Sequence, residues 1–214
     1  MSTRTLTGIL LILGPIGTFV IWGFLEPVII GNADTASENL KLYLANETAY
    51  LTLGIIGGVC FIGWFVGLGM LATLLRNKGG SGSAYSGAAA ILFPGLAGVA
   101  MASWGLQKQA IEVAKTVGHE AGHTLQLTAD NIGGGLGFVW PIATILIGTS
   151  IIMRKSEIPV TLGWVLSALA AIGVILFIFG TPSTPGLVGF LVWIAMGLTN
   201  AAMGFVLIRS QKSS

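Results

Sequence analysis

The sequence has very little charge. Asp, Glu, Lys and Arg make up only 8% of its 214 residues, and residues 158–208 contain none of them. Soluble domains average about a quarter charged residues, so a chain this poor in charge could not cover a soluble fold with polar side chains. The mean hydropathy of +0.89 agrees. The composition therefore excludes a soluble globular protein and predicts an integral membrane protein that lies in the lipid bilayer.

Cysteine is also nearly absent, and the chain has no region of different composition. Cys60 is the single cysteine, which excludes a disulfide within the chain. Because no segment has the composition of a soluble domain, residues 1–214 are expected to form a single integral membrane domain. No nucleic-acid partner is expected.

The apolar residues are arranged in runs of about 20, the length that crosses a hydrocarbon core about 30 Å thick. The pattern predicts an all-α fold, a polytopic bundle of six transmembrane helices. The expected spans are 6–30, 49–75, 84–106, 132–153, 159–179 and 186–208. The last two are separated only by the proline-containing segment GTPSTPG at 180–186.

The positions of the charges predict the orientation of the chain. If the amino terminus is cytoplasmic, the inner segments carry seven cations and one acid, Glu157, whereas the outer segments carry three cations and seven acids. Cytoplasmic loops of membrane proteins are enriched in Lys and Arg. Both termini are therefore expected in the cytoplasm, and the protein is expected in a prokaryotic cell membrane.

Two segments outside the spans have helical patterns. Residues 35–44 begin with TASE, a capping box, and then place Leu40, Tyr43 and Leu44 on one face, which predicts a short outer helix. Residues 106–127 have an apolar stripe and a polar stripe at helical spacing. This second pattern predicts that the third transmembrane helix continues outward as an amphipathic extension.

Both histidines lie in the motif HEAGH, at His119 and His123. On a helix, residues four apart share one face, so two imidazoles can bind one zinc ion while Glu120 activates a zinc-bound water. A catalytic zinc needs a third protein ligand. The metzincin extension is absent because Gln126 stands where its glycine belongs and Ala129 where its histidine belongs.

Three interpretations of this motif stay open. The first is a solvated polar helix face with no chemistry, in which case no cofactor is expected. The second is a contact to zinc or another divalent metal, or to a cofactor, without proteolysis, completed by Asp130 or by a partner subunit. The third is a zinc hydrolase with His119 and His123 as ligands and Glu120 as the catalytic base.

Two further features of the spans bear on function. Glu26 lies near the outer end of the first span, where an acid either reaches interfacial water or serves a function. The second span contains Gly54 and Gly58, and Gly63 and Gly67, at four-residue spacing. Such glycines allow close packing of helices, or alternatively line a substrate path with exposed backbone.

The stretches NETAYLTLGIIGGVCFIGWFVGLGMLATLLR and IIMRKSEIPVTLGWVLSALAAIG resemble a broad prokaryotic family of six-span integral membrane proteins known by a domain-of-unknown-function label. The resemblance implies the fold and transfers no activity.

For the function, the sequence favours a non-catalytic membrane protein that packs against itself or serves as a subunit of a larger membrane complex. The alternatives are the outward-facing zinc hydrolase and a small transporter or channel that uses Glu26.

Overall fold

The computed structural model describes residues 1–154, 157–179 and 187–210. This part of the chain contains helices and no strands, and six helical segments are long and apolar enough to cross a membrane. The first crossing is built from α1 (Thr3–Thr18), the π-helix η1 (Phe19–Leu25) and α2 (Glu26–Ile29). The other five are α4 (Glu47–Asn77), α5 (Ser83–Thr116), α6 (His119–Ile152), α7 (Val160–Phe179) and α8 (Leu187–Ser210). The predicted six-span bundle is confirmed; the segment 180–186 lies outside the described residues.

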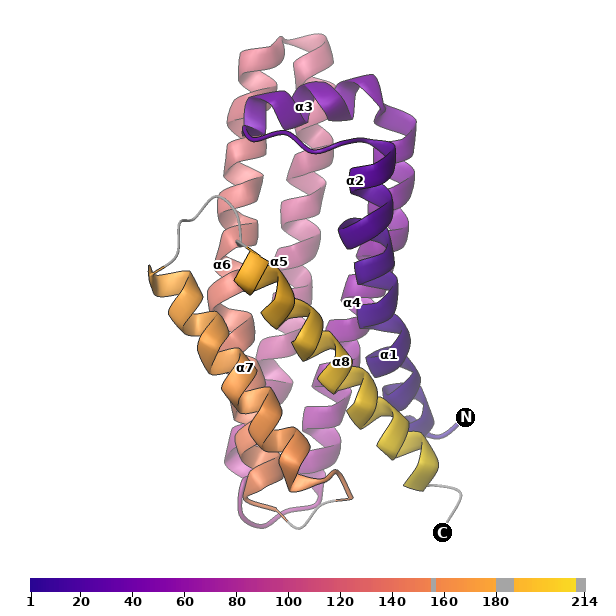
Figure 1. Ribbon diagram of the computed structural model, residues 1–214, viewed down its shortest axis with the longest axis vertical. Coiled ribbons are helices and arrows are strands. Elements are labelled where there is room, and N and C mark those ends of the chain that lie inside the picture. Colours follow the sequence, from indigo (N-terminus) through magenta and orange to yellow (C-terminus); the bar gives the residue numbers. More distant parts are fainter. Residues whose placement is uncertain (155–156, 180–186, 211–214) are drawn as a thin grey trace.

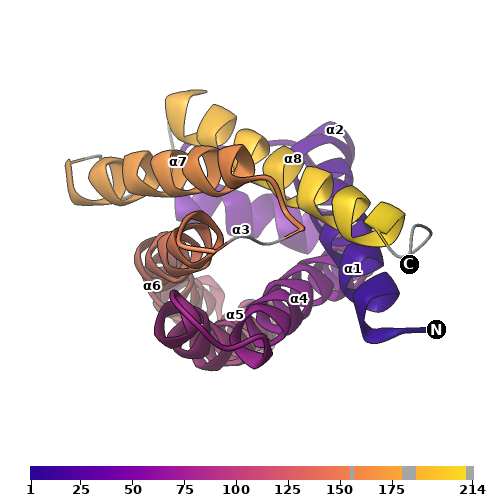
Figure 2. The ribbon, with the colours of Figure 1, turned by 90° about the horizontal axis from the view of Figure 1, so that it is seen from below.

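The helices are arranged so that the two ends of the bundle differ. The amino terminus and the carboxyl end of α8 lie at one end, while the antiparallel pair α5 and α6 extends furthest at the other (Figure 1). Seen from below, α4, α5 and α6 follow one another around one side, and α7 and α8 lie on the other (Figure 2). An aromatic cluster fills the core, with the rings of Trp64 and Trp140 packed edge to face at a centroid distance of 5.0 Å.

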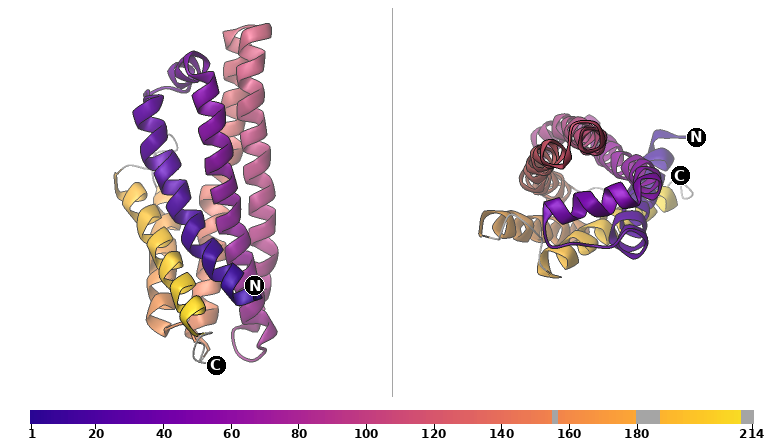
Figure 3. Two further views of the ribbon diagram at one scale, coloured as in Figure 1. Left: turned by 90° about the vertical axis from the view of Figure 1, so that its right-hand side faces the viewer. Right: turned by 90° about the horizontal axis from the view of Figure 1, so that it is seen from above.

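A short helix, α3 (Ala36–Ala45), lies across the end of the bundle opposite the amino terminus (Figure 3). The hydroxyl of Thr35 accepts a hydrogen bond from the backbone N–H of Glu38 and donates one to its carboxylate, at 3.2 and 3.0 Å. The first of these bonds satisfies a backbone N–H at the start of the helix that would otherwise lack a partner. The helix predicted at 35–44 is confirmed.

The extension predicted at 106–127 is present as a helical segment but is divided between two helices. α5 ends at Thr116, the chain turns at Val117 and Gly118, and α6 begins at His119. Gly118 has φ of +136° and ψ of 160°, a backbone conformation open essentially only to glycine. The polar residues of this segment therefore lie on two helices that meet at the tip of a hairpin, and not on one continuous helix.

Glycines allow two pairs of helices to approach closely. A Cβ added at Gly8 would lie 2.7 Å from the carbonyl oxygen of Gly204, and a Cβ at Gly204 would lie 2.6 Å from that of Gly8. Gly148 and Gly163 form a similar crossing between α6 and α7, at 2.8 and 3.0 Å. Small residues at such crossings bring helix backbones into contact in lipid.

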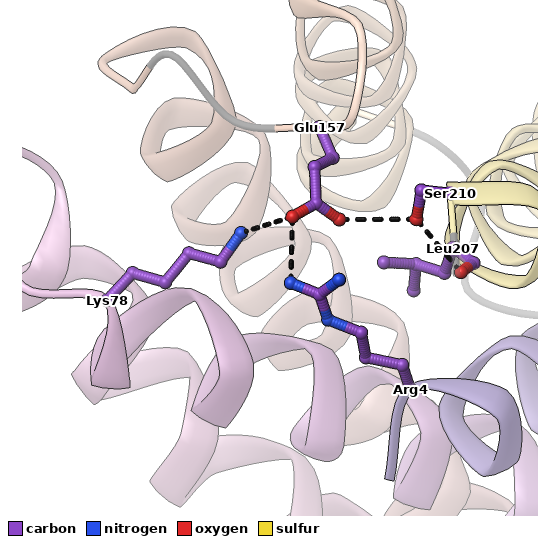
Figure 4. Close-up of polar contacts among 5 residues, drawn as sticks. All are labelled: Arg4, Lys78, Glu157, Leu207 and Ser210. Carbon is purple, nitrogen blue, oxygen red and sulfur yellow. Dashed lines mark hydrogen bonds and ion pairs between the residues drawn. The ribbon is translucent and has the colours of Figure 1, made fainter. Parts of the chain in front are cut away.

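A cluster around Glu157 joins four segments at the end of the bundle that carries the amino terminus (Figure 4). Its carboxylate accepts hydrogen bonds from Arg4 at 2.7 Å, Lys78 at 3.0 Å and the Ser210 hydroxyl at 3.2 Å. The Lys78 bond, helped by Arg4, holds the pKa of Glu157 below its usual value. The contribution to stability is therefore present at neutral pH and is lost as the pH falls through that lowered pKa. The cytoplasmic location of this end stays a prediction.

Candidate functional site

A cavity of about 370 Å³ lies beneath α3, between the first crossing, α4 and α5. It is called the α3 cavity here. Five aromatic side chains lie in its wall: Trp22, Tyr43, Tyr50, Phe61 and Trp104. The wall also contains three polar side chains that are not aromatic, Glu26, Ser103 and Gln107. Ligand sites for small molecules are commonly clefts of about 300–1,000 Å³ with mostly apolar walls and a few polar groups. The cavity has the size and the lining of such a site.

The glycines of α4 shape one wall of the α3 cavity. A Cβ at Gly54 would lie 2.7 Å from Nε1 of Trp104, so the absence of a side chain lets this indole lie against the helix. Gly57 accommodates the indole of Trp22 in the same way. A Cβ at Gly58 would meet no atom within 4 Å, and Gly58 lines the cavity. One glycine of the Gly54 and Gly58 pair thus serves packing, and the other leaves the cavity open.

Glu26 enters the α3 cavity from a helix with unusual geometry. The seven residues Phe19–Leu25 form a π-helix, and Glu26 directly follows them. π-helical turns are rare in proteins, and those that do occur are frequently located at functional sites. Glu26 is half-buried, and within the described part of the chain its carboxylate has no hydrogen-bond or ion-pair partner. A carboxylate so placed is costly unless a cation or a donor reaches it.

A chain of polar side chains continues from the cavity to its rim. The hydroxyl of Tyr50 donates to Oε1 of Gln107, and Nε2 of Gln107 donates to Oδ1 of Asp130, each at 3.2 Å. The ring of Tyr43 on α3 stacks on Tyr50 at a centroid distance of 4.1 Å. Burial, together with the carboxylates of Glu26 and Asp130, holds the pKa of Tyr43 above its usual value, so this phenol is neutral.

The HEAGH motif forms the first turn of α6, at the tip of the hairpin. The imidazole rings of His119 and His123 are nearly parallel, with an angle of 7° between their planes and 6.3 Å between their centroids. Nε2 of His119 is hydrogen-bonded to the hydroxyl of Ser37 on α3 at 2.9 Å. Glu120 is exposed and is not part of the cavity wall. His119 therefore links α3 to α6.

The described residues do not bring together a set of three metal ligands. No group of three or more His, Cys, Asp and Glu side chains in residues 1–154, 157–179 and 187–210 is placed to hold a metal ion. Asp130, which could complete a site on His119 and His123 as an alternative to a partner subunit, accepts a hydrogen bond from Gln107. A zinc site on the two histidines stays a prediction that needs a further ligand.

Sequence reasoning identified Glu26 but missed the side chains that surround it. Tyr50 and Trp104 attract notice in the sequence as aromatic residues near the outer ends of their spans, a position typical of the membrane interface. That pattern indicates the depth of a side chain and not the direction in which it points. Tyr50 and Trp104 are expected at the same depth in the membrane as Glu26, and this shared depth is the sequence signal that could have indicated a common site.

The comparisons with known proteins add no assignment. Neither protein-family models, nor curated proteins, nor solved structures contain a match to this chain, so the resemblance to a six-span family stays a prediction and the function has to be argued from the site itself.

Proposed function

We propose that this integral membrane protein binds a small organic molecule in the α3 cavity. The observation that carries the proposal is the cavity itself, about 370 Å³ in volume, with five aromatic side chains in its wall. The wall also holds the carboxylate of Glu26, which has no partner among the residues that the structure describes. Apolar walls supply affinity, and a few well-placed polar groups orient a ligand.

The surroundings of the cavity support binding rather than hydrolysis. α3 contributes Tyr43 to the wall and is tied to the hairpin by the bond between Ser37 and His119. The candidate catalytic base, Glu120, lies outside the wall. Transport through the membrane would require a path in addition to the site, and binding is the step that the cavity supports directly.

A substitution at Gly58 tests the proposal. The side chain of Gly58→Phe would extend into the cavity, because Gly58 lines it and a Cβ there meets nothing within 4 Å. We expect at least one of three probes with a common phenyl group, phenethylammonium, phenethyl alcohol or phenylacetate, to bind the wild type saturably, and Gly58→Phe to weaken its binding about tenfold or more. Tryptophan fluorescence can follow the titration, since Trp22 and Trp104 line the site.

Gly134→Phe is the matched control. Gly134 is exposed on α6, has open space at its Cβ and does not line the cavity. This variant should bind the probes as the wild type does. The proposal is wrong if none of the three probes binds saturably, or if Gly58→Phe and Gly134→Phe bind them equally well.

A second candidate function is the structural role favoured by the sequence, in the form of association with a second copy of the chain. On α5, Gly95, Gly98 and Gly105 are exposed, and a Cβ at any of them would meet nothing within 4 Å. A neighbouring helix could approach the backbone closely along this face. We expect light scattering in detergent to give the mass of an oligomer for the wild type and of a monomer for Gly98→Leu. A monomeric wild type would count against self-association.

A further inference from the structure

We infer that the α3 cavity selects an organic cation and that Glu26 is its counter-ion. This inference rests on the proposed binding function and specifies the chemical class of the ligand. The ligand would carry an ammonium group, which faces the Glu26 carboxylate, on an apolar body that packs against the aromatic wall.

The charge of the cavity has one sign. Among residues 1–154, 157–179 and 187–210, Glu26 is the charged residue in its wall and no Lys or Arg lines it. Asp130 adds a second carboxylate near the rim through its bond to Gln107. Lys115 pairs with Glu47 at 3.0 Å, and Lys41 and Lys108 are exposed and do not belong to the cavity wall. A half-buried carboxylate without a protein partner favours a cationic ligand and repels an anionic one.

The aromatic side chains favour the same class of ligand. The faces of Trp, Tyr and Phe rings attract cations, and clusters of such rings are a recurrent binding site for ammonium groups. The α3 cavity has two indoles, two phenols and one phenyl ring in its wall. Because the phenol of Tyr43 is held neutral beside Glu26, the ring adds an attractive face without adding another negative charge.

The ammonium group could belong to a soluble molecule or to the headgroup of a membrane lipid. Both would place the same charge against Glu26, and a volume of about 370 Å³ can accept either one. The two sources differ in one measurable respect, because only a lipid headgroup would compete with a soluble amine when lipid is added to the protein.

The test compares probes that differ in charge and little in shape. In uncharged maltoside micelles, we expect wild-type protein to bind phenethylammonium about tenfold or more tightly than phenethyl alcohol, and phenylacetate most weakly. Glu26→Gln keeps the size of the side chain and removes its charge, so it should abolish this preference while phenethyl alcohol still binds. Retained binding of the neutral probe also shows that the variant is folded.

Glu112→Gln is the control for a general effect of charge, since Glu112 is an exposed acid on α5 outside the cavity wall. It should preserve the tenfold preference. Adding phosphatidylethanolamine to the micelles should weaken phenethylammonium binding if the site takes lipid headgroups and leave it unchanged if the site takes soluble amines; either result is compatible with a cation site.

Two results would overturn the inference and leave the proposed function standing. One is equal affinity of the wild type for phenethylammonium and phenethyl alcohol, with both lost in Gly58→Phe. The other is a preference for the cation that persists in Glu26→Gln. If no probe binds in a manner sensitive to Gly58→Phe, the proposed function fails together with the inference.

Discussion

Gly204→Leu is expected to separate α8 from α1 and to lower the free energy of unfolding by about 3 kcal/mol, the upper part of the usual range for overpacking. A Cβ at this position would lie 2.6 Å from the carbonyl oxygen of Gly8 and 3.0 Å from the Cβ of Leu11. The first of these atoms belongs to the backbone and cannot rotate away, so the helices have to move apart. Unfolding titrations in mixed micelles, followed by tryptophan fluorescence, measure the loss.

Two other variants make this result specific to the crossing. Gly8→Leu should cause a loss of similar size, because the approach of Gly8 and Gly204 is reciprocal. Gly134→Leu adds the same side chain at an exposed position with open space and should unfold close to the wild-type midpoint. A wild-type midpoint for Gly204→Leu would show that α1 and α8 do not cross at these glycines.

The spans could be predicted because a single physical requirement determines them. A helix in lipid has to be apolar over the thickness of the hydrocarbon core, and the sequence displays this requirement directly as gaps between charges. The fifth span, predicted at 159–179, is observed as Val160–Phe179. The helix α3 was predictable for a similar local reason, since Thr35 caps the N–H of Glu38, three residues away.

The pairing of the helices could not be predicted from the same pattern. The four-residue spacing of glycines drew attention to the second span, whereas the reciprocal glycine crossings join Gly8 with Gly204 and Gly148 with Gly163. Apolar residues surround each of these helices on all sides, so the sequence does not indicate which face turns toward which neighbour. A contact between residues distant in the chain then leaves no local signal.

The candidate site was predictable only in part. Glu26 stands out as an acid at the end of an apolar run, but the π-helix before it alters the number of residues per turn and so rotates Glu26 relative to a regular α-helix. Counting at helical spacing therefore could not place Glu26 opposite Tyr43 and Trp104. The spacing of the two histidines, in turn, correctly places them on one face, yet spacing alone does not supply a third ligand.

The glycine of HEAGH has a structural role, and Gly122→Leu is expected to open the hairpin formed by α5 and α6. A Cβ at Gly122 would lie 2.5 Å from the Cβ of Ala114 and 2.6 Å from the carbonyl oxygen of Ala110. The helices would have to separate, and the bond between His119 and Ser37 would be lost with them. We expect amide hydrogen exchange across residues 110–126 to become about 100-fold faster, which corresponds to about 3 kcal/mol of local stability.

Gly134→Leu is the control for this expectation, because Gly134 is exposed on α6 and has open space at its Cβ. Its exchange should match that of the wild type, and equal exchange in Gly122→Leu would show that the hairpin is not closely packed there. The crossing gives the glycine of the motif a packing role. Gly118 makes the turn, Gly122 admits the backbone of α5, and His119 holds α3. A variant that opens the hairpin should therefore also weaken ligand binding in the α3 cavity, since α3 carries Tyr43 into its wall.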